Sequence, residues 1–138
     1  VRSAIGDTTD AEWKDQLAVN LDGPFYTTRA FLDDLIARRG RIVNIASIAG
    51  RQGTPMLSGY CASKHGLVGF TRATAEELRE HGVAVNAVCP GSVDTEMLRR
   101  GLPGAEPAMT PQDIARTVLF LADQAPNALT GTCVDVFG

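Results

Sequence analysis

The chain has 138 residues, of which 44% are hydrophobic and 21% are charged, and its formal net charge is -3. This composition predicts one soluble globular domain or part of one. It argues against nucleic-acid binding, because the only basic run is the short stretch 38–41, and against a membrane protein, because no apolar run approaches the roughly 20 residues that cross a bilayer.

The first forty residues predict one long helix. Thr8-Thr9-Asp10 followed by Glu12 is typical of a helix start with an acidic first turn. Apolar side chains then recur at helical spacing as far as Arg38, with Gly23-Pro24 as an interior break or kink. Asn20 lies inside this apolar pattern, and burying an unpaired amide costs about 1–3 kcal/mol. The sequence therefore predicts hydrogen-bond partners for Asn20.

Three short runs have the composition of strands, namely 41–47, 83–89 and 132–137. The first is largely apolar rather than alternating, as expected for a strand that a parallel sheet buries on both faces. The loop 48–59 follows it, and a second long helix is predicted from Ser58 or Gly59 to Gly82. Residues 92–109 are rich in Gly, Pro and charge and predict a mobile flap with a short helix near 96–100. Thr110-Pro111-Gln112-Asp113 marks a further helix start.

The order of these elements predicts an α/β fold with parallel strands and helices on both faces. In such a sheet, ligands bind beyond the carboxyl ends of the strands. Ser47, Tyr60 and Pro90-Gly91 all follow predicted strand ends. We therefore expect these residues to share one site.

Tyr60 and Lys64 are the most suggestive pair in the chain. Residues four apart on a helix are neighbours, and a cation beside a phenol lowers its pKa from about 10 toward the working pH. Such a tyrosine can act as a general acid or base. The alternative is that Tyr60 and Lys64 form an ordinary solvated pair on the surface. The chain has only two lysines but eleven arginines, which suggests that a lysine is specifically needed beside Tyr60.

Other candidate residues carry less weight. The chain has three cysteines, an odd number, and no C-x-x-C spacing among Cys61, Cys89 and Cys133. We therefore expect neither a disulfide framework nor a zinc site. A reducing, cytoplasmic compartment fits this pattern best. The two histidines have no carboxylate or cysteine arrangement around them and are interpreted as surface or packing residues. Asn44 and Asn86 are expected to tie down strand ends and loops.

Five motifs occur in a fixed order. They are Val19-Asn20-Leu21, the strand Arg41–Ser47, Tyr60-Cys61-Ala62-Ser63-Lys64, Asn86–Thr95, and Leu129-Thr130-Gly131. Together they resemble the carboxyl-terminal portion of the short-chain dehydrogenase/reductase family, with 3-oxoacyl-carrier-protein reductases as the nearest members. The resemblance covers nearly all of the chain. It implies a Rossmann-type doubly wound parallel sheet, with residues 1–138 as a single partial domain that carries the catalytic half.

The resemblance also implies residue roles. Tyr60 would exchange a proton with the oxygen of a small carbonyl or alcohol substrate, and Ser47 would orient that oxygen. Lys64 would lower the pKa of Tyr60 and bind the nicotinamide ribose, while Asn20 would hold a water linked to Lys64. NAD or NADP is the implied cofactor, and a homodimer or homotetramer is the implied assembly. The nicotinamide pocket would be shaped by Pro90, Gly91, Val93 and Thr95.

The chain departs from the family in one respect, because it holds no G-x-x-x-G-x-G loop for the cofactor's pyrophosphate. Two hypotheses follow. The first is an oxidoreductase represented by an incomplete chain. The second is a truncated, catalytically silent domain whose two long helices form a four-helix interface. If this half stood alone, the strand 41–47 would expose an apolar edge, so we expect the isolated 138-residue product to be poorly soluble.

Overall fold

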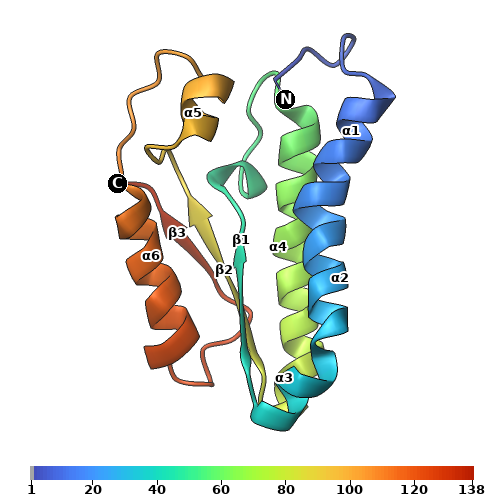
Figure 1. Ribbon diagram of the computed structural model, residues 1–138, viewed down its shortest axis with the longest axis vertical. Coiled ribbons are helices and arrows are strands. Elements are labelled where there is room, and N and C mark those ends of the chain that lie inside the picture. Colours follow the sequence, from blue (N-terminus) through green and yellow to red (C-terminus); the bar gives the residue numbers. More distant parts are fainter. Residues whose placement is uncertain (1) are drawn as a thin grey trace.

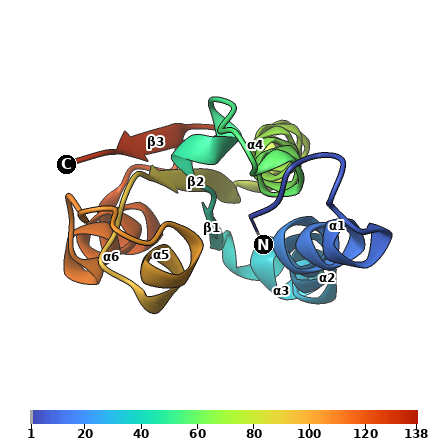
Figure 2. The same cartoon turned by 90° about the horizontal axis from the view of Figure 1, so that it is seen from above.

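The computed structural model describes residues 2–138. Within them, strands β1 (Arg41–Ile45), β2 (Ala84–Pro90) and β3 (Cys133–Val136) form one parallel sheet in the order β1-β2-β3. Helices lie on both faces of this sheet (Figure 1; Figure 2). The α/β class and the parallel arrangement predicted from the sequence are confirmed. No helix among the described residues is long and apolar enough to cross a membrane.

The first helical region is divided into several pieces. These are α1 (Asp10–Leu17), a π-helical turn (Ala18–Asp22), α2 (Gly23–Ala30) and α3 (Leu32–Arg38). The helix start predicted near Thr9 is confirmed, and a capping box between Thr9 and Glu12 forms it.

The interior break predicted at Gly23-Pro24 is present, because the π-helical turn Ala18–Asp22 ends there and α2 begins at Gly23 with Pro24 in its first turn. The π turn pairs the Gly23 amide with the Ala18 carbonyl, and Pro24, which has no amide hydrogen, then occupies an early position of the next helix. A second interruption lies at Phe31, whose φ and ψ are -104° and 9°.

Helix α4 (Ser58–Leu78) covers one face of the sheet. Its inner side contributes Leu67 and Ala75, which are almost fully buried, and the β2 residues beneath them are buried on both faces as far as Cys89. The helix ends in a 3-10 turn followed by Gly82, whose φ of 72° is the left-handed conformation typical of a helix end. Helices α1 and α2 lie beside α4 (Figure 1).

The opposite face of the sheet is covered by α6 (Pro111–Leu119), and the short helix α5 (Glu96–Gly101) lies near the carboxyl ends of the strands (Figure 2). The helix start predicted at Thr110-Pro111 is confirmed, and the Asp113 carboxylate accepts from the Thr110 amide there at 2.9 Å. A second π-helical turn, Phe120–Gln124, continues α6. The core on this side consists of Val88, Met109, Ile114, Leu121 and Ala125.

Two buried asparagines tie strands to neighbouring segments, as the sequence predicted. Asn44 donates to the Thr71 hydroxyl on α4 at 2.9 Å. Asn86 donates to the Leu129 carbonyl at 2.7 Å and accepts from the Thr132 amide at 3.1 Å. The Asn86 amide therefore fixes the loop that leads into β3.

Replacing Asn86 with Ala should lower the free energy of unfolding by about 2–4 kcal/mol, since it leaves two backbone groups without partners. Chemical denaturation would measure the change. The matched control is Asn127→Ala, which removes an exposed hydrogen bond from Arg41 and should cost less than about 0.5 kcal/mol. Equal losses in the two variants would contradict the role given to Asn86.

Strand β1 forms one edge of the sheet in the part of the chain that the structure describes. Ile45, at its carboxyl end, is 46% exposed. A groove of about 540 Å³ runs between this edge and α2. Its apolar lining includes Val19, Phe31, Ile42, Val43 and Ile45.

We therefore expect the 138-residue chain, produced alone, to be poorly soluble, because an open apolar strand edge invites pairing between copies. Size-exclusion chromatography and thermal melting would test this. Aggregated material is the expected result. A monodisperse preparation that melts cooperatively would contradict it.

Candidate active site

Ser47 lies just beyond the end of β1. The predicted strand 41–47 is two residues too long, because ladder pairing with β2 ends at Ile45 and only the Ala46 amide still bonds to Val88. The Ser47 hydroxyl instead accepts from the Ala49 amide at 3.1 Å and starts a 3-10 turn. Serine hydroxyls compete with strand ladders in this way. The turn leaves Ser47 largely buried at the carboxyl edge of the sheet.

Tyr60 and Lys64 share one face of α4, as their spacing predicted. The Lys64 ammonium lies 5.8 Å from the centre of the Tyr60 ring. Its Nζ donates to the Ile45 carbonyl at 2.8 Å. The first turns of α4 are therefore tied to the end of β1, and this contact brings the tyrosine and the lysine to the edge where Ser47 lies.

The pKa shifts at this edge differ from the expectation. Burial raises the pKa of Tyr60, and the nearby Ser47 hydroxyl opposes this without cancelling it. Burial lowers the pKa of Lys64. Lys64 does not lower the pKa of Tyr60 here, because its ammonium binds the Ile45 carbonyl and not the phenol oxygen. Tyr60 therefore holds its proton at neutral pH.

Asn20 lies within the π-helical turn and finds the partner that the sequence required. Its amide nitrogen donates to the Ser63 hydroxyl at 3.1 Å, and Ser63 donates in turn to the Tyr60 carbonyl at 2.8 Å. Ser63 is fully buried. In the sequence Ser63 stood out only as a member of the motif Tyr60-Cys61-Ala62-Ser63-Lys64, although a hydroxyl three positions after Tyr60 was a signal for this link.

The segment after β2 forms the other side of the edge. The Gly91 amide donates to the Val136 carbonyl at 2.9 Å, which holds Pro90-Gly91 against β3. Val93 pairs with Met109 through an isolated bridge. The Thr95 hydroxyl accepts from the Leu98 amide at 3.2 Å and caps α5. This segment and the turn after β1 lie at the same end of the sheet (Figure 1).

Gly50 is a site residue that the sequence did not indicate. A Cβ atom at this position would lie 2.7 Å from the Lys64 carbonyl and 3.2 Å from a Val68 methyl group. The turn after Ser47 therefore packs directly on the backbone of α4. This close approach sets the distance between Ser47 on one side and Tyr60 and Lys64 on the other.

The comparisons with known proteins agree with this geometry. A family model described as short chain dehydrogenase matches residues 1–104. The 3-oxoacyl-[acyl-carrier-protein] reductase FabG of Haemophilus influenzae is 36% identical over 140 residues, which cover 94% of this chain and 58% of the relative. Human (3R)-3-hydroxyacyl-CoA dehydrogenase is 36% identical over 142 residues, with 94% and 54% covered. The chain thus spans less than two thirds of the length of these relatives.

Solved structures show the same similarity. Carveol dehydrogenase from Mycobacterium avium, in complex with NAD, is 30% identical with a TM-score of 0.89, and the match covers 99% of this chain and 59% of that one. A 4-hydroxyisoleucine dehydrogenase complexed with NADH is also 30% identical, with a TM-score of 0.87 and coverage of 100% and 64%. The chain therefore belongs to the short-chain dehydrogenase family.

Proposed function

We propose that this protein is an NAD(P)-dependent oxidoreductase that interconverts a carbonyl compound and a secondary alcohol. The observation that supports this most directly is the arrangement at the carboxyl edge of the sheet. There the Ser47 hydroxyl is near enough to the Tyr60 phenol to oppose the rise in its pKa, and Lys64 extends from the same helix face as Tyr60. Two hydroxyls and a cation suit a substrate oxygen that gains negative charge.

Tyr60 is the proposed general acid in the direction of reduction. Burial raises the pKa of its phenol, so the group reaches the substrate in its protonated form. It would donate this proton to the substrate oxygen as negative charge develops there, and it would remove the proton again in the direction of oxidation. The Ser47 hydroxyl is the proposed second hydrogen-bond donor to the substrate oxygen, and together with the Tyr60 hydroxyl it would orient the carbonyl group.

Asn20 and Lys64 are the proposed supporting residues. Through Ser63, Asn20 holds the backbone of Tyr60 in place. The Lys64 ammonium is half-buried with a single carbonyl partner, and burial lowers its pKa, so further oxygen ligands would stabilise its charge. Asn20 would also hold a water that links Lys64 to solvent.

The residues at this edge fit the nicotinamide half of a dinucleotide. Lys64 and Tyr60 offer hydrogen-bond donors for the ribose hydroxyls. Asn20 would support them from the neighbouring π-helical turn. The wall after β2 would be formed by Pro90, Gly91, Val93 and Thr95, with the Val93 backbone and the Thr95 side chain facing the carboxamide. NAD or NADP supplies or accepts the hydride when it is bound.

The proposed assembly is a homodimer or homotetramer in the cytoplasm. The outer face of α4 carries small exposed residues, Ala62, Gly69 and Ala73, and α2 beside it exposes Phe25 and Tyr26. A flat stripe flanked by aromatic side chains suits close packing of helix pairs from two copies. Such an interface would bury the apolar side chains that α2 now exposes.

The substrate proposal follows the named relatives. FabG is named as a 3-oxoacyl-[acyl-carrier-protein] reductase and the human relative as a 3-hydroxyacyl-CoA dehydrogenase, so 3-oxoacyl thioesters are the first class to test. The full-length protein should oxidise NADH or NADPH in the presence of such a thioester. Ser47→Ala should lower kcat by about 10²–10³-fold, the effect of removing one oxyanion donor. Unchanged turnover in this variant would contradict the assignment of Ser47.

A silent interaction module is the competing hypothesis, and cofactor binding separates the two. NADH and NADPH fluorescence should show saturable binding with the full-length protein and none with residues 1–138 alone, because these residues lack the pyrophosphate loop. Saturable binding by the 138-residue chain would contradict that view of the phosphate site. Absence of binding by the full-length protein would favour the silent module.

A further inference from the structure

The loop between the two proposed catalytic hydroxyls contains a residue in a strained backbone conformation. Met56 has a φ of 65°, in the left-handed region that residues with a Cβ atom rarely adopt. It lies in the turn 54–57, which is closed by a hydrogen bond from the Leu57 amide to the Thr54 carbonyl at 3.2 Å. Pro55 comes directly before it. A turn with proline second and a positive φ third is of type II, and its third position normally holds glycine or asparagine.

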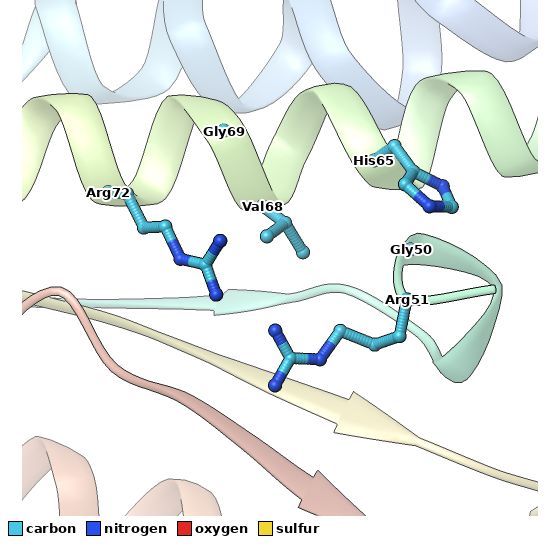
Figure 3. A pocket seen from close by; sticks show the side chains of 6 residues that line it. All are labelled: Gly50, Arg51, His65, Val68, Gly69 and Arg72. Carbon is cyan, nitrogen blue, oxygen red and sulfur yellow. The ribbon is translucent and has the colours of Figure 1, made fainter.

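The surrounding structure holds this conformation in place. At the start of the loop, Gly50 and Arg51 lie beside α4 (Figure 3), and the Arg51 guanidinium pairs with Asp135 of β3 at 3.0 Å. Near its end, the Met56 carbonyl accepts from the Ser3 amide at 3.0 Å. Strained residues persist only where several contacts determine them, and they cluster at functional sites. The anchored loop therefore presents Met56 in a defined position.

Packing does not account for a methionine in this turn. Met56 is 46% exposed, and among residues 2–138 it belongs to none of the buried hydrophobic clusters. The left-handed conformation is costly for a residue with a Cβ atom, whereas glycine adopts it without steric cost. A glycine would therefore suit the turn better. The reason for a methionine must lie in what its exposed side chain binds.

The position of the loop indicates what that is. The loop runs from the turn after Ser47 to the first turn of α4, where Tyr60 follows Met56 by four residues. It lies at the same end of the sheet as α5 (Figure 1), and α5 exposes a second methionine, Met97. Methionine side chains are flexible and polarizable and adapt to apolar ligands. A few polar groups with apolar side chains around them are typical of a small-molecule site.

We propose that Met56 is a specificity-determining residue that binds the apolar chain of the substrate, an inference that rests on the proposed function. When the carbonyl oxygen of a 3-oxoacyl thioester lies at Ser47 and Tyr60, the acyl chain beyond the reacting carbon extends along the loop to Met56. Each CH₂ group that leaves water for this contact strengthens binding. The site therefore selects longer acyl chains over the shortest one.

The test compares two substrates of the full-length protein, the CoA thioesters of 3-oxobutanoate and 3-oxooctanoate, each with NADH and with NADPH. The unaltered protein should have the higher kcat/KM for the longer thioester. Met56→Gly keeps the turn but removes the apolar contact, so it should lower kcat/KM for the longer thioester roughly tenfold. The value for the shorter one should change by less than about twofold, since its chain ends before the contact. Met56→Gln, which keeps the side chain's length but not its apolar character, should also weaken the preference.

Arg39 provides the matched control. It is the other non-glycine residue with a positive φ in the part of the chain that the structure describes, with a value of 49° at the end of α3. It lies just before the amino end of β1, away from the proposed site. Arg39→Gly makes the same backbone change and should leave kcat/KM for both thioesters unchanged.

Three outcomes would count against the inference, and they are distinguishable. An unchanged chain-length preference in Met56→Gly, or no preference in the unaltered protein, would overturn the assignment of Met56 and leave the proposed function intact. A lower thermal midpoint in Met56→Gly would mean that the side chain packs on another part of the full-length protein or on a second copy, and this would overturn it too. Absence of turnover with both thioesters and both cofactors would overturn the substrate class of the proposed function, and the role of Met56 with it.

Discussion

Replacing Tyr60 with Phe is expected to lower kcat of the full-length protein by about 10²–10⁴-fold, the range typical of a lost general acid. The variant keeps the ring and its packing on α4 but removes the hydroxyl that is the proposed proton donor to the substrate oxygen. Cofactor affinity should change by less than about twofold, since a single hydroxyl among several contacts is removed. Steady-state kinetics and a fluorescence titration would measure the two effects separately.

Tyr26→Phe is the matched control for this experiment. Tyr26 is 55% exposed on α2 and lies outside the candidate active site. The same chemical change there should leave kcat unchanged. If Tyr60→Phe retained turnover comparable to that of Tyr26→Phe, Tyr60 would not be the general acid.

Gly50→Ala is expected to damage both stability and activity. The added Cβ would lie 2.7 Å from the Lys64 carbonyl, so either the turn after Ser47 or the α4 backbone must move. Overpacking of this kind costs about 1–3 kcal/mol. Because the turn carries Ser47 and the helix carries Tyr60 and Lys64, the same movement should also reduce kcat. Denaturant unfolding and steady-state kinetics would measure the two losses.

Gly53 provides the control for Gly50. It lies in the same loop, has no atom within 4 Å of a built Cβ, and does not have a positive φ. Gly53→Ala should therefore change the free energy of unfolding by less than about 0.5 kcal/mol. If the two variants were equally stable, the close approach of Gly50 to α4 would not constrain the site.

The sequence was sufficient to predict the parallel sheet and the residues gathered at its edge. Ser47 follows β1, Pro90 ends β2 and Tyr60 lies in the first turn of α4, and the carboxyl ends of parallel strands meet at one edge. The helix starts at Thr9 and Thr110 could also be predicted from the sequence, because each capping pattern is complete within four residues.

The contacts that the sequence did not reveal depend on tertiary structure. The Ile45 carbonyl that binds Lys64 is a backbone group, so no residue type marks it. The proximity of Gly50 to α4 depends on how a turn packs against Lys64 and Val68, helix residues 14 and 18 positions later in the sequence. To predict the hydrogen bond between Ser63 and Asn20, one must know which face of α4 carries Ser63 and that Asn20 lies in a π-helical turn. A π-helical turn has no simple sequence pattern.

The expected effect of Lys64 on Tyr60 shows a second limit of spacing arguments. A separation of four residues places two side chains on one helix face, but it does not determine which acceptor the Lys64 ammonium binds. Lys64 binds a carbonyl at the strand end, and burial then raises the pKa of Tyr60. The sequence predicted the pair correctly, whereas the direction of the pKa shift required the burial and hydrogen bonds of the folded chain.

The most direct test of the proposed active site is a crystal structure of the full-length protein with NAD or NADP and a bound carbonyl or alcohol ligand. We expect the ligand oxygen within about 2.6–3.2 Å of both the Tyr60 phenol oxygen and the Ser47 hydroxyl oxygen. A ligand oxygen that contacts neither hydroxyl, in a protein that still turns over, would contradict the proposal.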